Sequence, residues 1–329
     1  MSTATVRKIL LSLTILLTIF AFSSCGKNYE PFILTYDNRE AIGYTGAEGE
    51  ELVIPATFKG EDGVWYKVVA IDKSAFYACS TLKSVTIPDG VERIGEQAFY
   101  MCTQIERVTI PDSVTSIERD AFGGCKSLTR MTLPKGLTTI GDFAFSSTGM
   151  IGIEIPDGVT SIGNSAFGGS ENLQRIIIPD SVTSIGKYAF ADTALESVTI
   201  PDSVTSVGDR LFAGCGKLKS VKLPRGLTSI GENMFSGCRA LSSIDIPDGV
   251  TSIGENAFSY CKTLGTVKIP ASVKSIGKGA FENCSSLYSV SFESTSGWKA
   301  GKTSIDVTSS SANADLLSET YCQEKWTCK

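Results

Sequence analysis

Phenylalanine recurs along this chain at intervals of 22 or 23 residues, and this period constrains the fold more than any other feature. Nine of the eleven prolines repeat with the same period, from Pro88 to Pro270. Two residue types that share one period mark a repeat array, and a period in the twenties is typical of a solenoid whose units bury their apolar faces against their neighbours. Ten of the sixteen phenylalanines keep the interval: Phe76, Phe99, Phe122, Phe145, Phe167, Phe190, Phe212, Phe235, Phe258 and Phe281.

The apolar residues of a single unit fall into three short groups. Residues 241–246 alternate polar and β-branched side chains and end at Pro247, which cannot donate to a strand ladder. After an Asp-Gly turn, residues 250–253 have apolar ends and are followed by a glycine. Residues 255–261 carry apolar side chains spaced by three and four positions, which fits one turn of helix. We therefore predict three walls per turn: two short strands and a helical turn.

Three motifs recur in a constant order: Leu-x-x-Val/Ile-x-Ile-Pro, then Val-x-x-Ile-Gly, then Ala-Phe-x-x-Cys. Together they resemble the BspA-type leucine-rich repeat of bacterial surface proteins, over about two thirds of the chain. The resemblance implies a mainly β, right-handed leucine-rich-repeat solenoid of about ten 22–23-residue units, each with two short parallel strands and a short helical turn, capped at both ends. It also implies an association with surface adhesion, and it implies no defined active site.

The N-terminus has the features of an export signal. Arg7 and Lys8 precede an apolar stretch from residue 9 to 22, which is shorter than the roughly 20 apolar residues that span a bilayer. Ser24 and Cys25 then resemble a bacterial lipobox, so we expect Cys25 to be acylated and to anchor the chain in the membrane. The alternative is an ordinary secretory signal followed by an incidental cysteine. We expect an exported outer-membrane lipoprotein on the cell surface, or otherwise in the periplasm.

The terminal repeats need caps, because each would otherwise expose its core face and unpaired strand edges. Apolar residues between Asn313 and Trp326 suggest a short helix followed by an extended segment at the C-terminal end. We divide the chain into four parts: a signal peptide (1–24), an N-terminal anchor and cap (25–66), the leucine-rich repeat domain (67–293) and a C-terminal cap (294–329).

Seven of the ten cysteines stand three residues after a repeated phenylalanine, and Thr148, Ser170 or Thr193 takes this place in the other three units. Small residues able to donate to a neighbouring carbonyl indicate a buried packing column. A linear column without histidine does not suit tetrahedral zinc. Cys322 and Cys328 lie outside the repeats of an exported chain, and we predict that they form a disulfide.

The chemistry of the common enzyme classes is missing from the sequence. The chain contains no histidine, which removes the usual nucleophile activation and the commonest general base. The repeated aspartates follow the repeat proline and fit turn positions, and the glycines do not form a phosphate-binding loop. With 30 basic against 35 acidic residues, nucleic-acid binding is not expected. We predict no enzymatic activity and no cofactor or metal.

The residues that flank the central apolar position of the first strand should face solvent. Most are serine or threonine, but a cluster in the first half departs from this pattern. An arginine fork suits carboxylates and acidic or sulfated glycans, whereas the alternative is an ordinary solvated sheet face. The candidate contact residues are Arg107, Arg130, Ile151, Glu154, Arg175 and Ile177.

These observations leave three functions open. The first is a surface-anchored, non-catalytic binding or adhesion module that recognises an extracellular protein or glycan through the solenoid. The second is a periplasmic or surface spacer without a specific ligand, consistent with solvent-facing positions that are mostly serine or threonine. The third is a carboxylate-dependent glycan hydrolase, for which the sequence shows no singular pair of acids.

Overall fold

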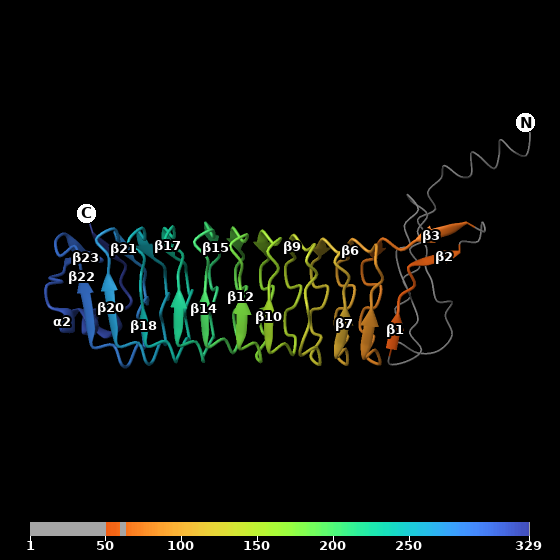
Figure 1. The fold of residues 1–329 in the computed structure, drawn as a ribbon. Helices are drawn as coiled ribbons and strands as arrows, with labels where there is room; N and C mark the ends of the chain where they lie inside the picture. The colour runs from red at the N-terminus through yellow and green to blue at the C-terminus, as the bar shows by residue number, and fades with distance from the viewer. Residues whose placement is uncertain (1–50, 60–63, 329) are drawn as a thin grey trace, which may run out of the picture.

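A computed structural model describes residues 51–59 and 64–328 as an elongated parallel β-solenoid with a short cap at its C-terminal end (Figure 1). One wall consists of strands of two to four residues that point the same way and are one turn apart, except at residues 130–132, where one turn contributes no strand. From the N-terminal end these strands are β1 (Glu51–Val53), β5 (Ser84–Thr86), β7 (Arg107–Thr109), β10 (Gly152–Glu154), β12 (Arg175–Ile177), β14 (Ser197–Thr199), β16 (Ser220–Lys222), β18 (Ser243–Ile244), β20 (Thr266–Ile269) and β22 (Ser289–Phe292).

The second wall consists of ten two-residue strands in the described part of the chain, so the predicted number of units and the second strand are confirmed. Between the walls, the valine after each Pro-Asp turn donates its N–H to the proline carbonyl, as Val250 does to Pro247 over 3.0 Å. The strands are β4 (Ala70–Ile71), β6 (Arg93–Ile94), β8 (Ser116–Ile117), β9 (Thr139–Ile140), β11 (Ser161–Ile162), β13 (Ser184–Ile185), β15 (Ser206–Val207), β17 (Ser229–Ile230), β19 (Ser252–Ile253) and β21 (Ser275–Ile276).

The third wall is not the helical turn that the sequence predicts. Every second backbone N–H donates to a carbonyl of the next turn, as Phe76 N–H does to Ala98 O over 2.7 Å. The intervening N–H groups donate to the carbonyl three residues back in the same turn, as Cys79 N–H does to Phe76 O over 3.2 Å. This alternation needs positive φ two residues before and two residues after each core phenylalanine, as at Asn256 (φ 54°) and Tyr260 (φ 60°). Apolar residues spaced by three and four positions fit either geometry locally, and the bonds between turns select this one.

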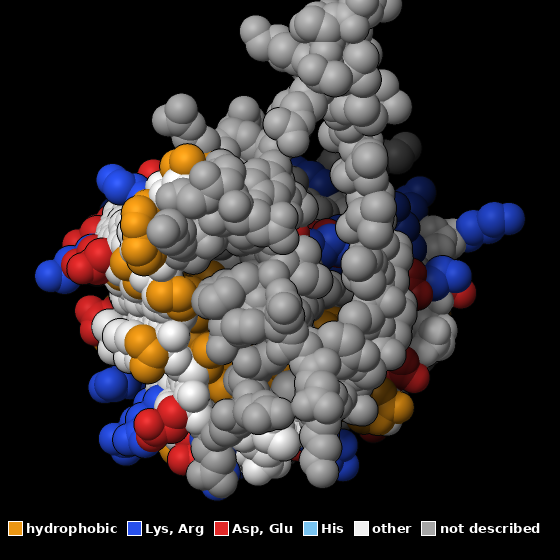
Figure 2. Space-filling model, turned by 90° about the vertical axis from the view of Figure 1, so that its right-hand side faces the viewer, with side chains coloured by type: hydrophobic (Ala, Val, Ile, Leu, Met, Phe, Trp, Pro, Cys, Tyr) orange, Lys and Arg blue, Asp and Glu red, His pale blue; other side chains and the backbone are white. Residues whose placement is uncertain are grey.

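The core is a continuous column built around the repeated phenylalanines. All ten are at most 1% exposed, and their rings lie nearly parallel with centroids 4.9 to 5.9 Å apart along the column. Leucine, isoleucine and valine from the two strand walls surround them. In the space-filling view from the N-terminal side, charged side chains of both signs project along the left and right outline of the molecule (Figure 2).

The solenoid begins before the predicted boundary at residue 67. β1 pairs in parallel with β5, with Leu52 opposite Val85, and therefore forms the first-wall strand of an additional turn. A hairpin of β2 (Thr57–Lys59) and β3 (Trp65–Lys67) is inserted before that turn continues into β4. The described residues of the predicted N-terminal cap, 51–59 and 64–66, thus belong to the first, irregular turn of the solenoid.

The C-terminal cap contains the predicted helix and extended segment. β25 (Trp326–Cys328) pairs antiparallel with β21 and with β23 (Trp298–Ala300), which in turn pairs with β24 (Thr303–Ser304). The helix α2 (Ser310–Asp315) continues into a π-helical turn η1 (Leu316–Thr320) and covers the end of the first wall. There the Asn313 amide donates to the carbonyl of Val290 over 2.9 Å, in place of a further turn.

Candidate functional site

The first-wall strands expose the side chains that the sequence placed outside. In β7, Arg107 and Thr109 are exposed whereas Val108 is buried, and β12 repeats the pattern at its residues 175–177. Ile151 is 43% exposed and Ile177 is 45% exposed, although both are large and apolar. All six predicted contact residues are exposed on this wall: Arg107, Arg130, Ile151, Glu154, Arg175 and Ile177.

The strand register brings the predicted residues together around Gly152. In the pairing of β10 with β12, Gly152 lies opposite Arg175 and Glu154 lies opposite Ile177. On the other side, the N–H of Ile151 bonds to Thr129 O over 3.1 Å, which places Arg130 one turn before Gly152. Neighbouring turns are ~4.8 Å apart, so the two arginines stand about 10 Å apart across a residue without a side chain.

The arginines of this cluster differ in their pairing from two cations farther along the same wall, Lys219 and Lys268. Lys219 Nζ lies 2.8 Å from Glu196 Oε2, and Lys268 Nζ lies 2.6 Å from Glu293 Oε1. In the described part of the chain, no ion pair involves any of the three predicted arginines, namely Arg107, Arg130 and Arg175. Their guanidinium groups are therefore available to a carboxylate or sulfate from outside.

Most of the threonines that precede the second-wall strands use their hydroxyl groups internally. The Thr138 hydroxyl donates to Thr115 O over 3.0 Å, and the Thr183 hydroxyl donates to Thr160 O over 3.2 Å. Each threonine hydroxyl that follows this pattern donates its hydrogen bond to a backbone carbonyl of the preceding turn. These threonine hydroxyls are therefore not free donors for a partner.

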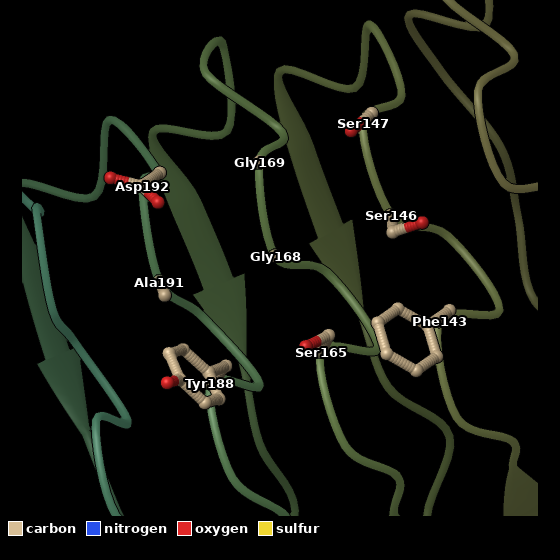
Figure 3. A pocket seen from close by; sticks show the side chains of 9 residues that line it. All are labelled: Phe143, Ser146, Ser147, Ser165, Gly168, Gly169, Tyr188, Ala191 and Asp192. Atoms are coloured by element: carbon tan, nitrogen blue, oxygen red, sulfur yellow. The ribbon is translucent and has the colours of Figure 1, made fainter.

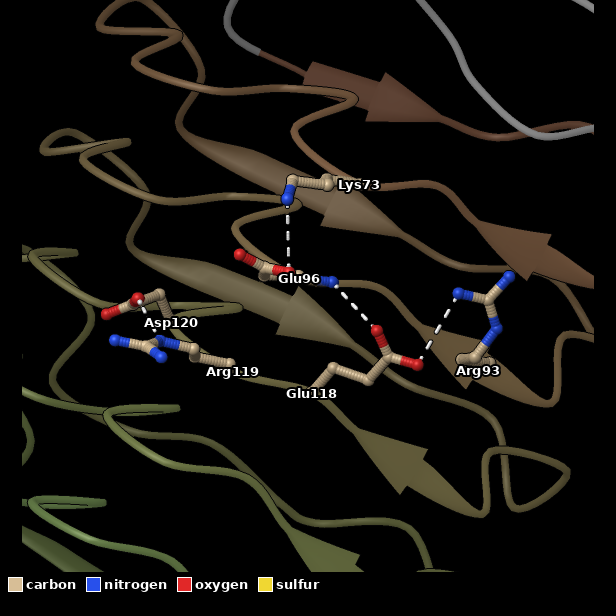
Figure 4. Close-up of polar contacts among 6 residues, drawn as sticks. All are labelled: Lys73, Arg93, Glu96, Glu118, Arg119 and Asp120. Atoms are coloured by element: carbon tan, nitrogen blue, oxygen red, sulfur yellow. Dashed lines mark hydrogen bonds and ion pairs between the residues drawn. The ribbon is translucent and has the colours of Figure 1, made fainter.

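Glu118, which replaces the glycine that ends the second strand in most turns, has a structural role (Figure 4). Its carboxylate accepts a bond from the Glu96 N–H over 3.0 Å and faces Arg93 Nη1 at 3.4 Å. Both atoms belong to the preceding turn. The carboxylate thus joins two turns at the corner between the second and third walls and is not oriented toward a ligand.

The cysteine column has the packing role that the sequence predicted. The thiol of Cys102 donates to Phe76 O over 2.9 Å, and Ser170, which takes a cysteine position, donates to Phe145 O over 3.0 Å. Burial raises the pKa of Cys125 and of Cys284 to about 12, so these thiols are protonated at neutral pH. Within the described residues, no group of three or more His, Cys, Asp or Glu side chains could hold a metal ion.

Cys322 and Cys328 are not brought together. The Cys328 N–H bonds to Lys274 O and its thiol donates to Ser296 O over 3.2 Å, whereas the Cys322 carbonyl accepts from Gly279 N. Four residues of the last turn, 275–278, lie between these two attachment points, whereas a disulfide needs Cα atoms within ~7 Å. The predicted bridge is absent from the structure. The predicted lipidation site Cys25 lies outside the described residues.

The third wall holds a shallow groove that sequence reasoning missed. It has a volume of about 220 Å³, and Phe143 and Tyr188 stand on either side of Ser165 at its lower end in the close-up view (Figure 3). The available signal was the replacement of small or polar residues by aromatic ones two positions before Phe145 and Phe190. The other lining residues are Ser146, Ser147, Gly168, Gly169, Ala191 and Asp192.

Several solved structures are similar to this chain. A leucine-rich repeat protein from Bacteroides ovatus is 27% identical, with 83% of this chain and 94% of that chain covered and a TM-score of 0.43. A leucine rich cell surface protein from Faecalibacterium prausnitzii is 30% identical, with 83% and 96% covered and a TM-score of 0.42. The pneumococcal vaccine antigen PcpA is 19% identical, with 79% and 78% covered and a TM-score of 0.48.

No curated protein matches the chain. Among the residues that the structure describes, no helix is long and apolar enough to cross a membrane. A family model described as the BspA type leucine rich repeat region, in six copies, matches residues 69–195 and 183–298. This match covers more than half of the chain and coincides with the regular turns of the solenoid. The chain therefore belongs to the BspA-type leucine-rich repeat family.

Proposed function

We propose that this protein is a non-catalytic, surface-anchored binding module that recognises an acidic extracellular protein or glycan through its first wall. The observation that carries the proposal is the cluster of arginines that have no ion-pair partner among the described residues. The cluster consists of Arg107, Arg130 and Arg175 around Gly152, and we refer to it as the arginine cluster.

The chemistry of the cluster favours an anionic ligand. Arg130 and Arg175 present planar forks about 10 Å apart, and the gap at Gly152 lets a ligand approach the strand backbone. Ile151 and Ile177 add exposed apolar surface beside the charges. Apolar contacts next to charge-assisted hydrogen bonds are a combination that protein interfaces use for affinity and specificity.

Charge reversal tests this proposal. The full chain carrying Arg107→Glu, Arg130→Glu and Arg175→Glu is compared with a matched control carrying Lys217→Glu, Arg239→Glu and Lys262→Glu, three exposed cations away from the cluster. Binding is measured to immobilised heparin, as a sulfated glycan, and to a panel of extracellular matrix proteins at low and high salt. We expect at least a tenfold loss of binding in the cluster variant, a small change in the control, and weakening by salt.

Equal binding by both triple variants would place recognition elsewhere. Binding to none of the probes by the unaltered chain would favour the spacer function. Export and anchoring are a separate part of the proposal, supported by the order Arg7, Lys8, apolar stretch and Cys25. Protease treatment of intact cells and mass analysis of the N-terminal peptide test it: cleavage together with an acylated Cys25 supports a surface lipoprotein, whereas protection places the chain in the periplasm.

A further inference from the structure

The groove on the third wall lies where two aromatic side chains replace the usual residues of one column. This column lies two positions before each core phenylalanine, and its backbone has positive φ, which favours glycine and asparagine. The later turns follow that preference with Asn233, Asn256 and Gly279. Phe143 (φ 56°) and Tyr188 (φ 57°) instead place bulky rings at this strained position, two turns apart.

The turn between the two aromatic residues carries only small side chains where it lines the groove. Ser165 occupies the same column, and Gly168 and Gly169 form the floor beside it (Figure 3). The buried phenylalanines beneath are spaced by 5.5 and 5.9 Å, so Phe143 and Tyr188 lie about 11 Å apart along the solenoid. A space that is one turn wide is left between them.

A second glycine pair on the same wall shows that such a space is filled elsewhere. A Cβ added at Gly123 would lie 3.0 Å from the Tyr100 ring, and one added at Gly124 would lie 2.5 Å from Met101 Sδ. Tyr100 and Met101 therefore occupy the space over that pair. Over Gly168 and Gly169 the neighbours are smaller: a Cβ added at Gly169 would lie 2.9 Å from Ser147 Oγ, and one added at Gly168 would lie 3.1 Å from Tyr188 O. Serine in place of tyrosine and methionine leaves a shallow hollow there.

The groups around the hollow favour a neutral, hydroxyl-rich ring. Serine hydroxyls line it, and an apolar ligand would leave them without hydrogen-bond partners, whereas the Asp192 carboxylate lies at its edge, beside Gly214 of the next turn. A cationic ligand is disfavoured because a guanidinium already lies over each ring: Arg119 at 5.5 Å from the Phe143 centroid and Arg210 at 5.4 Å from the Tyr188 centroid. The volume of about 220 Å³ is below the range of drug-sized ligands and suits one small ring.

We propose that this groove binds a single neutral pyranose unit of a glycan. The aromatic rings of Phe143 and Tyr188 contact the apolar C–H surface of the sugar, and the serine hydroxyls accept hydrogen bonds from its hydroxyls and donate hydrogen bonds to them. The site is separate from the arginine cluster in both its position and its ligand charge. The sugar-binding proposal can therefore be tested separately from the proposed function.

The test uses the full chain and a panel of neutral methyl glycosides of glucose, galactose, mannose and N-acetylglucosamine. Saturation-transfer NMR in a detergent without a sugar head group measures their binding. Tyr188→Ala removes one aromatic wall. Ser165→Gln fills the hollow with a side chain that the same column accepts at Gln97, which also has positive φ. Tyr260→Ala, which removes an exposed tyrosine of the third wall outside the groove, is the control.

We expect at least one glycoside to bind the unaltered chain, with affinity at least tenfold lower in Tyr188→Ala and in Ser165→Gln and unchanged in Tyr260→Ala. Thermal unfolding of each variant shows whether the fold is retained, and Ser165→Gln keeps the test valid if Tyr188→Ala does not fold. No saturation transfer to any glycoside, or equal transfer in the groove variants, overturns the proposal. Stronger binding of tetramethylammonium than of every glycoside also overturns it, because the groove would then be a cation site.

Discussion

The thiol of Cys125 donates a hydrogen bond to the carbonyl oxygen of Phe99, which belongs to the preceding turn, over 3.2 Å. Cys238 and Cys261 make the same contact with Phe212 and Phe235, respectively. The cysteine column thus joins consecutive turns through the carbonyls of the phenylalanine column. Two residue positions three apart in the sequence hold the turns together along the core.

The first prediction concerns alkaline pH. Burial raises the pKa of Cys125 to about 12 and that of Cys215 to about 11, above the 9.0 of an exposed thiol. Since the unfolded chain loses these protons first, the free energy of unfolding should be unaffected by the thiols below pH 9 and fall as pH rises toward 11. Urea unfolding at pH 8 and 10.5 measures the change.

Cys125→Ser is the matched variant for this prediction, because Ser170 already fills a cysteine position and donates to Phe145 O. The variant should lose less stability than the unaltered chain between the two pH values. An equal loss in both chains would show that Cys125 does not contribute to alkaline unfolding.

The second prediction concerns the phenylalanine column. Phe190 is fully buried, with neighbouring ring centroids at 5.9 and 5.7 Å. Phe190→Ala should leave a cavity between two turns and lower the free energy of unfolding by ~3 to 5 kcal/mol. Chemical denaturation measures it, with Tyr288→Ala, at a 68% exposed side chain, as the control. A loss below ~1 kcal/mol for Phe190→Ala would show that the column is not the core.

The third prediction concerns the glycine that ends the second strand. A Cβ at Gly163 would lie 2.5 Å from the backbone of Gly141 and Asp142 in the preceding turn. Gly163→Ala should therefore push two turns apart and destabilise the protein by about 2 kcal/mol. Gly226→Ala is the control, because a Cβ there meets nothing within 4 Å and should change stability by less than ~0.5 kcal/mol. Equal melting temperatures for the two variants would contradict the close approach of the turns.

The fourth prediction concerns the cysteines of the C-terminal cap. Cys322 is half-buried and no bridge holds it in the structure, so iodoacetamide at pH 8 should modify it in the native protein. The column thiol of Cys125 should react only after unfolding, because it is buried and protonated. Peptide mapping by mass spectrometry locates the modified residues. A non-reduced digest that contains a peptide linking Cys322 to Cys328 would restore the disulfide predicted from the sequence.

Much of the solenoid follows from the sequence, because its contacts repeat at one period. The spacing of Phe145 and Phe167 predicts neighbouring turns, and the rings stack at 5.5 Å. Alternation around Val108 predicts which side chains face solvent, because successive strand residues point to opposite faces. The exposure of the arginine cluster could be predicted for the same reason.

Only the tertiary structure decided features that depend on contacts between turns or on the ends of the chain. The third wall could be helical by its local spacing, but the bond from Phe76 N to Ala98 O requires the alternating backbone instead. Cys322 and Cys328 are close in sequence, yet β25 and the last turn hold them at separate points. Phe143 and Tyr188 flank one groove because the intervening turn carries only small side chains there. A periodic sequence determines which residues share a column, whereas their packing across turns determines where a column leaves a space.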